Sequence, residues 1–414
     1  MRQIKLSLGI ITCLNILFCA NQVVANPGNS SQVATKKAPQ DFITWCKQKE
    51  QLPQATKTTI DTLLKYVKEE DCQKANQKLN RLTKLSISVG KISDIKPLSR
   101  LTNLTHLELK MLKVSDIQPL SNLRKLTYLD LSSNQIKDIS PLGKLSQLTQ
   151  LRLDSNQISN IQALSGLNNL TQLSIHNNQI QNISSLSKLT KLDKLSLVGN
   201  EIIDIKPLSQ LNKITNLNLG RNQISDLQPL SRLTNLSILN LFNNKVVRLD
   251  SLSRLSKLNL LSVEGNQITN LQPISNLKGL TTLILDGNQI KDIKPIANLN
   301  NLNTLTLSNN QVTDIIALSR LTNLTYIVLS NNQVSNLQPL SGLKKIDTLY
   351  LEANKINDIK PLTGLVNLKL LNLNSNQIVE IKPLANLKKL NLLYLQDNPI
   401  REKLCPIKPG ECSF

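Results

Sequence analysis

The sequence predicts a mainly β solenoid built of stacked coils, and two observations favour it over a set of globular domains. Aromatic residues make up only 2% of the 414 residues, although an irregular globular core normally uses large rings to reach close packing. A 22-residue unit also recurs from residue 79 to residue 400 without insertion or deletion. A fixed period of this length is typical of repeat proteins, in which each unit buries its apolar edges against its neighbours.

The first 25 residues have the composition of a secretory signal. Arg2 and Lys5 precede an apolar stretch over residues 6–20, and the segment ends in small residues at Ala25. The apolar stretch is shorter than the roughly 20 residues that span a bilayer, and an uncleaved anchor is the alternative. We expect cleavage after Ala25, a secreted or periplasmic protein that is not integral to a membrane, and a flexible polar linker over residues 26–40.

Residues 41–78 separate this linker from the repeats and predict a helical N-terminal cap. Trp45, Leu63 and Val67 are among apolar residues spaced like the buried face of helices. A cap is needed because the end coil of a solenoid exposes apolar surface and unpaired strand edges. Residues 401–414 follow the last repeat, and we expect them to form the C-terminal cap.

Each repeat follows the pattern L-x-x-L-x-x-L-x-L-x-x-N-x-I-x-D-I-x-P-L, as in residues 123–142. There are fifteen units, the last one truncated, and every unit begins with Leu. The alternation at Leu129 and Leu131 has the period of a β-strand, so these two side chains point into the coil and the residues beside them point outward. Asp138 resembles a cap for the turn that follows it.

The asparagine at the twelfth position of the unit, Asn134 in this example, predicts a buried ladder. In a stack of coils its amide lies inside and pairs with backbone groups that would otherwise be buried without partners. The first two units carry Gly90 and Leu112 at this position, whereas all thirteen later units keep Asn. We therefore expect the first two coils to be transitional.

Four of the six cysteines lie outside the signal, with one pair on each side of the repeats. The two ends of a long solenoid cannot meet, so the pairing of Cys46 with Cys72 and of Cys405 with Cys412 is the one that remains. Two disulfides indicate an oxidising compartment. Metal binding is the competing use of these cysteines, although neither histidine lies near them in the sequence.

The repeat resembles the short, 22-residue class of bacterial leucine-rich repeats found in internalins, and a regulatory subunit of a eukaryotic protein phosphatase carries a similar unit. The resemblance covers Leu79 to Ile400. It implies a right-handed arc with a parallel β-sheet on the concave side and 3₁₀ or irregular segments on the convex side. The segment from Phe42 to Cys72 is similar to the helical cap of secreted bacterial repeat proteins, and residues 398–414 resemble a disulfide-closed C-terminal cap.

The outward strand positions predict a concave face with two different halves. In the first seven units they include Lys84, His106, Glu108, Lys110, Arg152, Asp154, Lys194 and Arg221. From the eighth unit onward they include Ile238, Phe242, Leu260, Ile284, Tyr326, Val328, Tyr350, Leu370, Leu392 and Tyr394. Exposed apolar and aromatic surface marks contact sites, and β-propensity alone is the alternative explanation. We expect a partner-binding site formed by Phe242, Ile284, Tyr326, Val328, Tyr350 and Tyr394.

A basic stripe precedes the strands along one side of the coils. It consists of Arg81, Arg100, Arg124, Lys125, Lys144, Lys188, Lys191, Lys213, Arg232, Arg254, Lys257, Lys278, Arg320, Lys344, Lys345, Lys388 and Lys389. In a chain with a net charge of +21, such a stripe suits nucleic acid, anionic lipid or acidic polysaccharide. Export argues against nucleic acid, which leaves an acidic envelope glycan or a purely solubilising role.

The sequence offers little chemistry for catalysis. His106 and His176 both occupy outward positions, and no metalloprotease, nucleophile-elbow or phosphate-loop motif is present. Glu264 and Asp286 lie on adjacent strands and could form an acid–base pair, with solvated surface as the alternative. We therefore expect a binding module without catalytic residues, cofactor or metal. Its ligand is a protein or peptide on the concave face, or alternatively an acidic glycan on the basic stripe.

Overall fold

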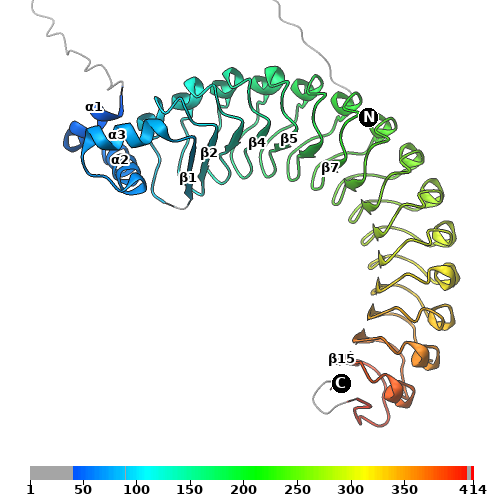
Figure 1. Cartoon of the computed structure of the whole chain (residues 1–414). Helices are drawn as coiled ribbons and strands as arrows, with labels where there is room; N and C mark the ends of the chain where they lie inside the picture. Colours follow the sequence, from blue (N-terminus) through cyan, green and yellow to red (C-terminus); the bar gives the residue numbers. More distant parts are fainter. Residues whose placement is uncertain (1–40, 89, 408–411) are drawn as a thin grey trace, which may run out of the picture. The chain divides into compact units, whose positions relative to one another are not determined.

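The computed structural model describes residues 41–88, 90–407 and 412–414, which belong to one compact unit. Within this unit the predicted solenoid is confirmed: successive coils place their strands on the inner side and their 3₁₀ segments on the outer side (Figure 1). The predicted signal and linker, residues 1–40, lie outside the described residues. None of the helices among the described residues is long and apolar enough to cross a membrane.

Helices of the described part of the chain precede the first strand and form the expected N-terminal cap. They are α1 (Phe42–Lys47), α2 (Gln54–Val67) and α3 (Cys72–Arg81), with the 3₁₀ segment η1 (Lys49–Gln51) between the first two. The carboxylates of Asp41 and Asp71 start α1 and α3 because they accept hydrogen bonds from the backbone N–H groups of Thr44 (2.7 Å) and Lys74 (2.8 Å). Helix α3 continues to Arg81, so the first repeat leucine lies within a helix and is fully buried.

The cap is joined internally by a disulfide and docked on the first coil by two hydroxyl groups. Cys46 and Cys72 form the expected disulfide between α1 and α3, with their Cα atoms 5.7 Å apart. In α2, the hydroxyl of Thr56 donates to a carboxylate oxygen of Asp94, and the hydroxyl of Thr59 donates to its backbone carbonyl, each over 2.6 Å. These contacts hold the helices over the end of the solenoid.

Within the described residues, a sixteen-stranded parallel sheet runs through the coils in sequence order. Its strands are β1 (Lys84–Ser88), β2 (His106–Lys110), β3 (Tyr128–Asp130), β4 (Gln150–Arg152), β5 (Gln172–Ser174), β6 (Lys194–Ser196), β7 (Asn216–Asn218), β8 (Ile238–Asn240), β9 (Leu260–Ser262), β10 (Thr282–Ile284), β11 (Thr304–Thr306), β12 (Tyr326–Val328), β13 (Thr348–Tyr350), β14 (Leu370–Asn372), β15 (Leu392–Tyr394) and β16 (Cys412–Ser413). From β1 to β15, neighbouring strands pair with an offset of one repeat, as in Tyr128 with Gln150 and Gln150 with Gln172. Residues 22 apart in the sequence are therefore neighbours across the sheet.

A 3₁₀ segment follows each of the strands β1 to β14 on the opposite side of the coil. These segments are η2 (Lys96–Leu98), η3 (Gln118–Asn122), η4 (Ser140–Lys144), η5 (Gln162–Gly166), η6 (Ser184–Leu186), η7 (Lys206–Leu208), η8 (Gln228–Leu230), η9 (Asp250–Leu252), η10 (Gln272–Ile274), η11 (Lys294–Ile296), η12 (Ile316–Arg320), η13 (Gln338–Leu340), η14 (Lys360–Gly364) and η15 (Lys382–Asn386). The expected Asp cap is present, because Asp138 accepts a hydrogen bond from the backbone N–H of Ser140 over 2.8 Å. Asp204 caps η7 at Lys206 in the same way.

The C-terminal cap adds a strand that the repeat pattern does not predict. Cys405 and Cys412 form the expected disulfide, with their Cα atoms 5.8 Å apart. The last strand, β16, then pairs in parallel with β15, so that Cys412 lies beside Leu393 and Ser413 beside Tyr394. The open edge of the repeat sheet is thereby covered at this end.

The asparagine ladder fills the inside of the turn after each strand from β3 to β15, as predicted. In the third coil, the amide nitrogen of Asn134 donates to the carbonyls of Leu109 (2.7 Å) and Leu131 (2.9 Å), and its oxygen accepts from the N–H of Val114 (3.1 Å). Only 8% of Asn134 is exposed. The ladder therefore pairs backbone groups that the aliphatic core of the coils would leave without partners.

The residue before each of several ladder asparagines adopts a left-handed backbone conformation. Its φ is 58° at Ser133, 52° at Asn177 and 64° at Gly199. Arg221 has the same conformation, with a φ of 53°. Arg221 therefore belongs to this tight turn, and its assignment to an outward strand position was wrong.

Candidate ligand-binding face

The outward side chains of the sheet form three columns along the concave face. In β3 and its equivalents, the first column is the first strand residue (Tyr128), the second is the last strand residue (Asp130), and the third is the second residue after the strand (Ser132). The constant register places successive members of a column on adjacent strands, about 4.8 Å apart. All six residues of the predicted site lie in these columns, on β8, β10, β12, β13 and β15 or just after them.

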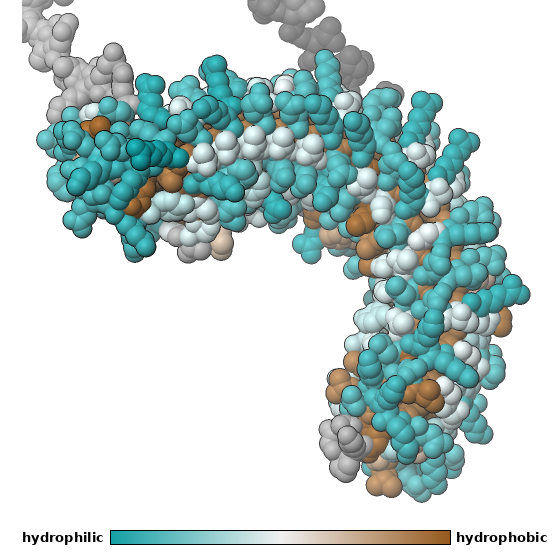
Figure 2. All heavy atoms as spheres, in the orientation of Figure 1, coloured by the Kyte–Doolittle hydropathy of each residue, from teal (hydrophilic) through white to brown (hydrophobic). Residues whose placement is uncertain are grey.

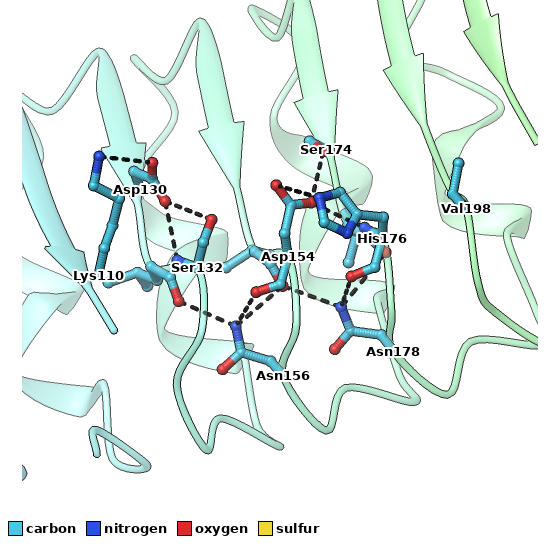
Figure 3. A network of polar contacts seen from close by, with 12 residues as sticks. Lys110, Asp130, Ser132, Asp154, Asn156, Ser174, His176, Asn178 and Val198 are labelled. Carbon is cyan, nitrogen blue, oxygen red and sulfur yellow. Dashed lines mark hydrogen bonds and ion pairs between the residues drawn. The ribbon is translucent and has the colours of Figure 1, made fainter. Parts of the chain in front are cut away.

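Asp154, in the third column, joins two coils in the N-terminal half of this face. Its carboxylate accepts hydrogen bonds from the hydroxyl of Ser174 (2.6 Å) and the backbone N–H of His176 (2.9 Å), and it lies 3.3 Å from Nε2 of the same histidine (Figure 3). Ser174 and His176 both contact the carboxylate, so the histidine is not placed as a base for the serine. We interpret the cluster as a structural contact that joins the two coils.

Asp286 repeats this arrangement in the C-terminal half. Its carboxylate accepts hydrogen bonds from the hydroxyl of Thr306 and from the backbone N–H of Ser308, both in the next coil. Glu264, its neighbour in the third column, is exposed. Asp286 is thus bonded to the following coil, and the two carboxylates do not form a hydrogen-bonded acid–base pair.

A charged network covers the first strands. Glu108 accepts a hydrogen bond from the hydroxyl of Ser86 over 2.8 Å, and the ammonium of Lys110 lies 3.2 Å from Glu108 and 3.8 Å from Asp130. The hydrogen bond from Ser86 and the nearby ammonium of Lys110 hold the pKa of Glu108 below its ordinary value, although burial opposes them. These three charged side chains therefore pair with one another.

Two rings lie beside this network. His106 and Tyr128 stack with their centroids 5.7 Å apart and their planes at 18°. They line a shallow hollow between α2 and β1–β4, which Tyr66 of α2 also borders. Within the described part of the chain, no three His, Cys, Asp or Glu residues gather as a potential metal site.

The C-terminal half of the face carries the apolar and aromatic side chains that the sequence singles out. Tyr326 and Tyr350, on adjacent strands, place their ring centroids 6.1 Å apart. Tyr326 is 36% exposed and Leu392 is 45% exposed, whereas Val328 and Tyr394 are half-buried. Burial, together with the nearby Tyr350, raises the pKa of Tyr326. These rings are preorganised against the sheet but remain partly open to solvent.

Phe242 begins this apolar surface and depends on a glycine one repeat earlier. A Cβ atom on Gly220 would overlap the ring of Phe242, which therefore lies directly over the glycine backbone. The contact was not predicted, although a glycine 22 residues before an outward phenylalanine is a usable signal. Ile284 is half-buried two strands further on.

Part of the basic stripe has a role in the structure that the sequence analysis missed. The ammonium group of Lys125 donates to the side-chain oxygen of Asn103, one repeat earlier, over 2.8 Å. The same contact recurs at Lys191, Lys257, Lys345 and Lys389, at 2.7–2.8 Å. These lysines of the stripe thus bridge successive coils.

The surface view shows how polar the outside of the coils is. In Figure 2 the visible face of the described coils is mainly hydrophilic, and hydrophobic atoms show between the coils from the N-terminal cap to the last coils.

A family model described as "Leucine Rich repeats (2 copies)" matches the chain at residues 124–166, 146–188, 168–210, 190–232, 278–320 and 322–364. No curated protein matches the sequence significantly.

Solved structures of bacterial repeat proteins are similar over most of the chain. An internalin (InlF) of Listeria monocytogenes is 32% identical, with a TM-score of 0.67, and the match covers 80% of this chain and 93% of the internalin. A leucine-rich-repeat protein of Leptospira interrogans is 28% identical, with a TM-score of 0.73, and the match covers 81% of this chain and 88% of the other. A plant peptide hormone receptor, solved in complex with RGF2, shares the fold at 21% identity and a TM-score of 0.60, over 77% of this chain and 64% of the receptor chain.

Proposed function

Because the chain belongs to the internalin-like class of leucine-rich-repeat proteins, we propose that it is an exported binding protein that holds a protein or peptide ligand on the C-terminal half of its concave face. The observation that carries this proposal is the exposed aromatic surface around Tyr326 and Tyr350. Large rings at solvent-facing strand positions offer contact area at a small cost in side-chain entropy, and such rings often dominate binding energy.

The aliphatic interior supports this interpretation over a purely structural one. The inward residues of these coils, such as Leu305, Ile327 and Leu349, are fully buried, so the coils have a complete core without the outward rings. Strand preference alone accounts for a scatter of β-branched and aromatic residues. It gives no reason for tyrosines to gather in one half of the face.

The plant receptor solved in complex with RGF2 supports the proposal only in a general way. It has the same fold, and repeat folds serve unrelated partners. Export is supported by the two disulfides, because such bonds persist in oxidising compartments. The signal predicted over residues 1–25 agrees with export.

Binding of an acidic envelope glycan to the basic stripe is the second candidate. Arg124, Lys144, Lys188, Arg232 and Arg254 are exposed and spread along the stripe, and this arrangement favours a linear polyanion. The lysine-to-asparagine contacts weaken the candidate, because they give other members of the stripe a structural role.

The two candidates separate in a binding experiment with a partner recovered from the native envelope by the purified protein. We expect Tyr350→Ala to weaken binding at least tenfold, since truncation of a central interface ring often costs about 2 kcal/mol or more. Asn357→Ala, an exposed residue of the same coil outside the columns, is the matched control. Lys188→Glu tests the stripe at low and moderate salt. If Tyr350→Ala binds normally and Lys188→Glu loses binding, the ligand binds the basic stripe and not the concave face.

A further inference from the structure

The charge of the concave face changes between its two halves. From β8 to β15, the three columns contain Glu264, Asp286 and Glu352, and no lysine or arginine occupies any of these positions. The whole chain carries 49 basic residues against 28 acidic ones. The surface proposed to bind the ligand is thus negatively charged in a strongly positive protein.

The N-terminal half of the same columns shows the contrast. It includes the basic residues Lys84, Lys110, Arg152 and Lys194, and its carboxylates have partners nearby, as Asp154 does in Ser174 and His176. The absence of cations is therefore a property of the aromatic half, not of the concave face as a whole.

Two of the three carboxylates in the aromatic half can still bind a ligand. Glu264 is exposed, and its carboxylate accepts no hydrogen bond from any of the described residues. Glu352 accepts a hydrogen bond from the side-chain amide of Asn372 over 3.1 Å through one oxygen, which leaves the other open. Asp286 differs from both, because Thr306 and Ser308 already bond its carboxylate.

These two carboxylates stand beside the apolar side chains. Glu264 follows Phe242 in the third column, and Glu352 lies two residues after Tyr350. They are four strands apart, a separation of about 19 Å that an extended peptide spans in about six residues. A segment lying across these columns would therefore meet Glu264, then the apolar side chains that β10, β12 and β13 supply from the first two columns, and then Glu352.

We propose that the ligand of this face is an extended peptide segment that carries basic side chains on either side of apolar ones. This inference rests on the function proposed above. Glu264 and Glu352 bind the basic groups, and the apolar side chains between them, from Ile284 on β10 to Tyr350 on β13, bind the apolar ones. Charge complementarity selects this partner, because an acidic segment would be repelled here and attracted to the basic stripe. At about 0.15 M salt the screening length is about 8 Å, so the carboxylates in direct contact outweigh the distant positive charges.

The test is selection of peptides from a displayed library of random dodecamers on the purified protein at about 0.15 M salt. We expect enrichment of sequences with a net positive charge and several apolar residues. Their affinity should fall about threefold in Glu264→Gln or Glu352→Gln and about tenfold in the double variant, as for exposed ion pairs. The double variant Glu201→Gln/Glu380→Gln is the matched control, because it changes the net charge equally outside the columns and should bind as wild type.

The other outcomes separate this inference from the function on which it rests. Neutral or acidic peptides that still lose affinity in Tyr350→Ala would overturn the inference and leave the proposed function in place. Basic peptides that bind the Glu264→Gln/Glu352→Gln variant as they bind wild type would also overturn it. If the selected peptides bind Tyr350→Ala as tightly as wild type, the proposed function and the inference are both wrong. The same holds if no peptide is enriched above a surface without the protein.

Discussion

Replacement of Asn222 by alanine tests the ladder that holds the coils together. The amide nitrogen of Asn222 lies 3.0 Å from the carbonyls of Leu197 and Leu219 and 3.1 Å from that of Gly220, and its oxygen accepts from the N–H of Ile202 over 3.0 Å. Only 8% of Asn222 is exposed. The substitution therefore removes four contacts at once, two within the coil of Asn222 and two to the preceding coil.

The cost is smaller than four lost hydrogen bonds, because the ladder is shared between coils. Asn200 also donates to the carbonyl of Leu197, and Asn244 also donates to that of Leu219, both over 3.0 Å. The N–H of Ile202 has no second acceptor among the described residues. One buried donor thus loses its partner, and the expected cost is about 1–3 kcal/mol.

Amide hydrogen exchange is the assay that resolves this effect, because long repeat arrays do not unfold in two states. We expect Asn222→Ala to remove protection at Ile202 and to leave the equivalent amide at Ile180, bonded to Asn200, protected. Asn216→Ala, on the outward side of the same coil, should cost less than about 0.5 kcal/mol, because its side chain makes no hydrogen bond to the described residues. Unchanged protection at Ile202, with unchanged unfolding, would refute this account of the ladder.

Three further predictions concern the N-terminal cap, a left-handed turn and the dependence of stability on pH. Cys46→Ser removes the disulfide to Cys72, which spans 26 residues. The loss should lower the free energy of unfolding by about 3–4 kcal/mol. The cap should then unfold before the central coils, as measured by fluorescence of the single tryptophan for the cap and by circular dichroism for the coils. Gly199→Ala should cost about 1–3 kcal/mol in urea melts, because the residue has a φ of 64° and a Cβ would overlap a neighbouring side chain; Gly287→Ala shares the positive φ without the overlap and should cost less. The pKa of Glu108 is lower in the folded protein than its ordinary value of 4.5, so its stabilising contribution is present above that pH and is lost as the pH falls through the lowered folded pKa; Glu108→Gln should make the denaturation midpoint less sensitive to acid, and an equal acid dependence in both proteins would contradict this.

The features that repeat every 22 residues could be predicted from the sequence. The inward leucines at positions such as Leu129 and Leu131 follow from strand periodicity, and both are fully buried. The asparagine ladder follows from the requirement that buried backbone groups be paired. One pair of cysteines at each end of a structure too long to close on itself left one pairing, and both disulfides are present.

Side-chain contacts between neighbouring coils could not be predicted in the same way. Lys125 on Asn103 and Phe242 on Gly220 are one repeat apart, but the pattern treats their positions as variable. Asp154 is an outward residue by periodicity, and yet it is 7% exposed because the next coil supplies its donors. The position of a side chain was therefore predictable, whereas its partners depended on the choice of residue in the adjacent coil.

The strand β16 limits the growth of the sheet at one end. A stack of near-identical coils has no intrinsic length, since each strand offers the next one the same row of hydrogen-bonding groups. An uncovered β15 could accept a strand from another molecule by edge-to-edge pairing. Two residues held by the Cys405–Cys412 disulfide occupy that edge. Because these residues take up the hydrogen-bonding groups of β15, another chain cannot pair with that strand without displacing them.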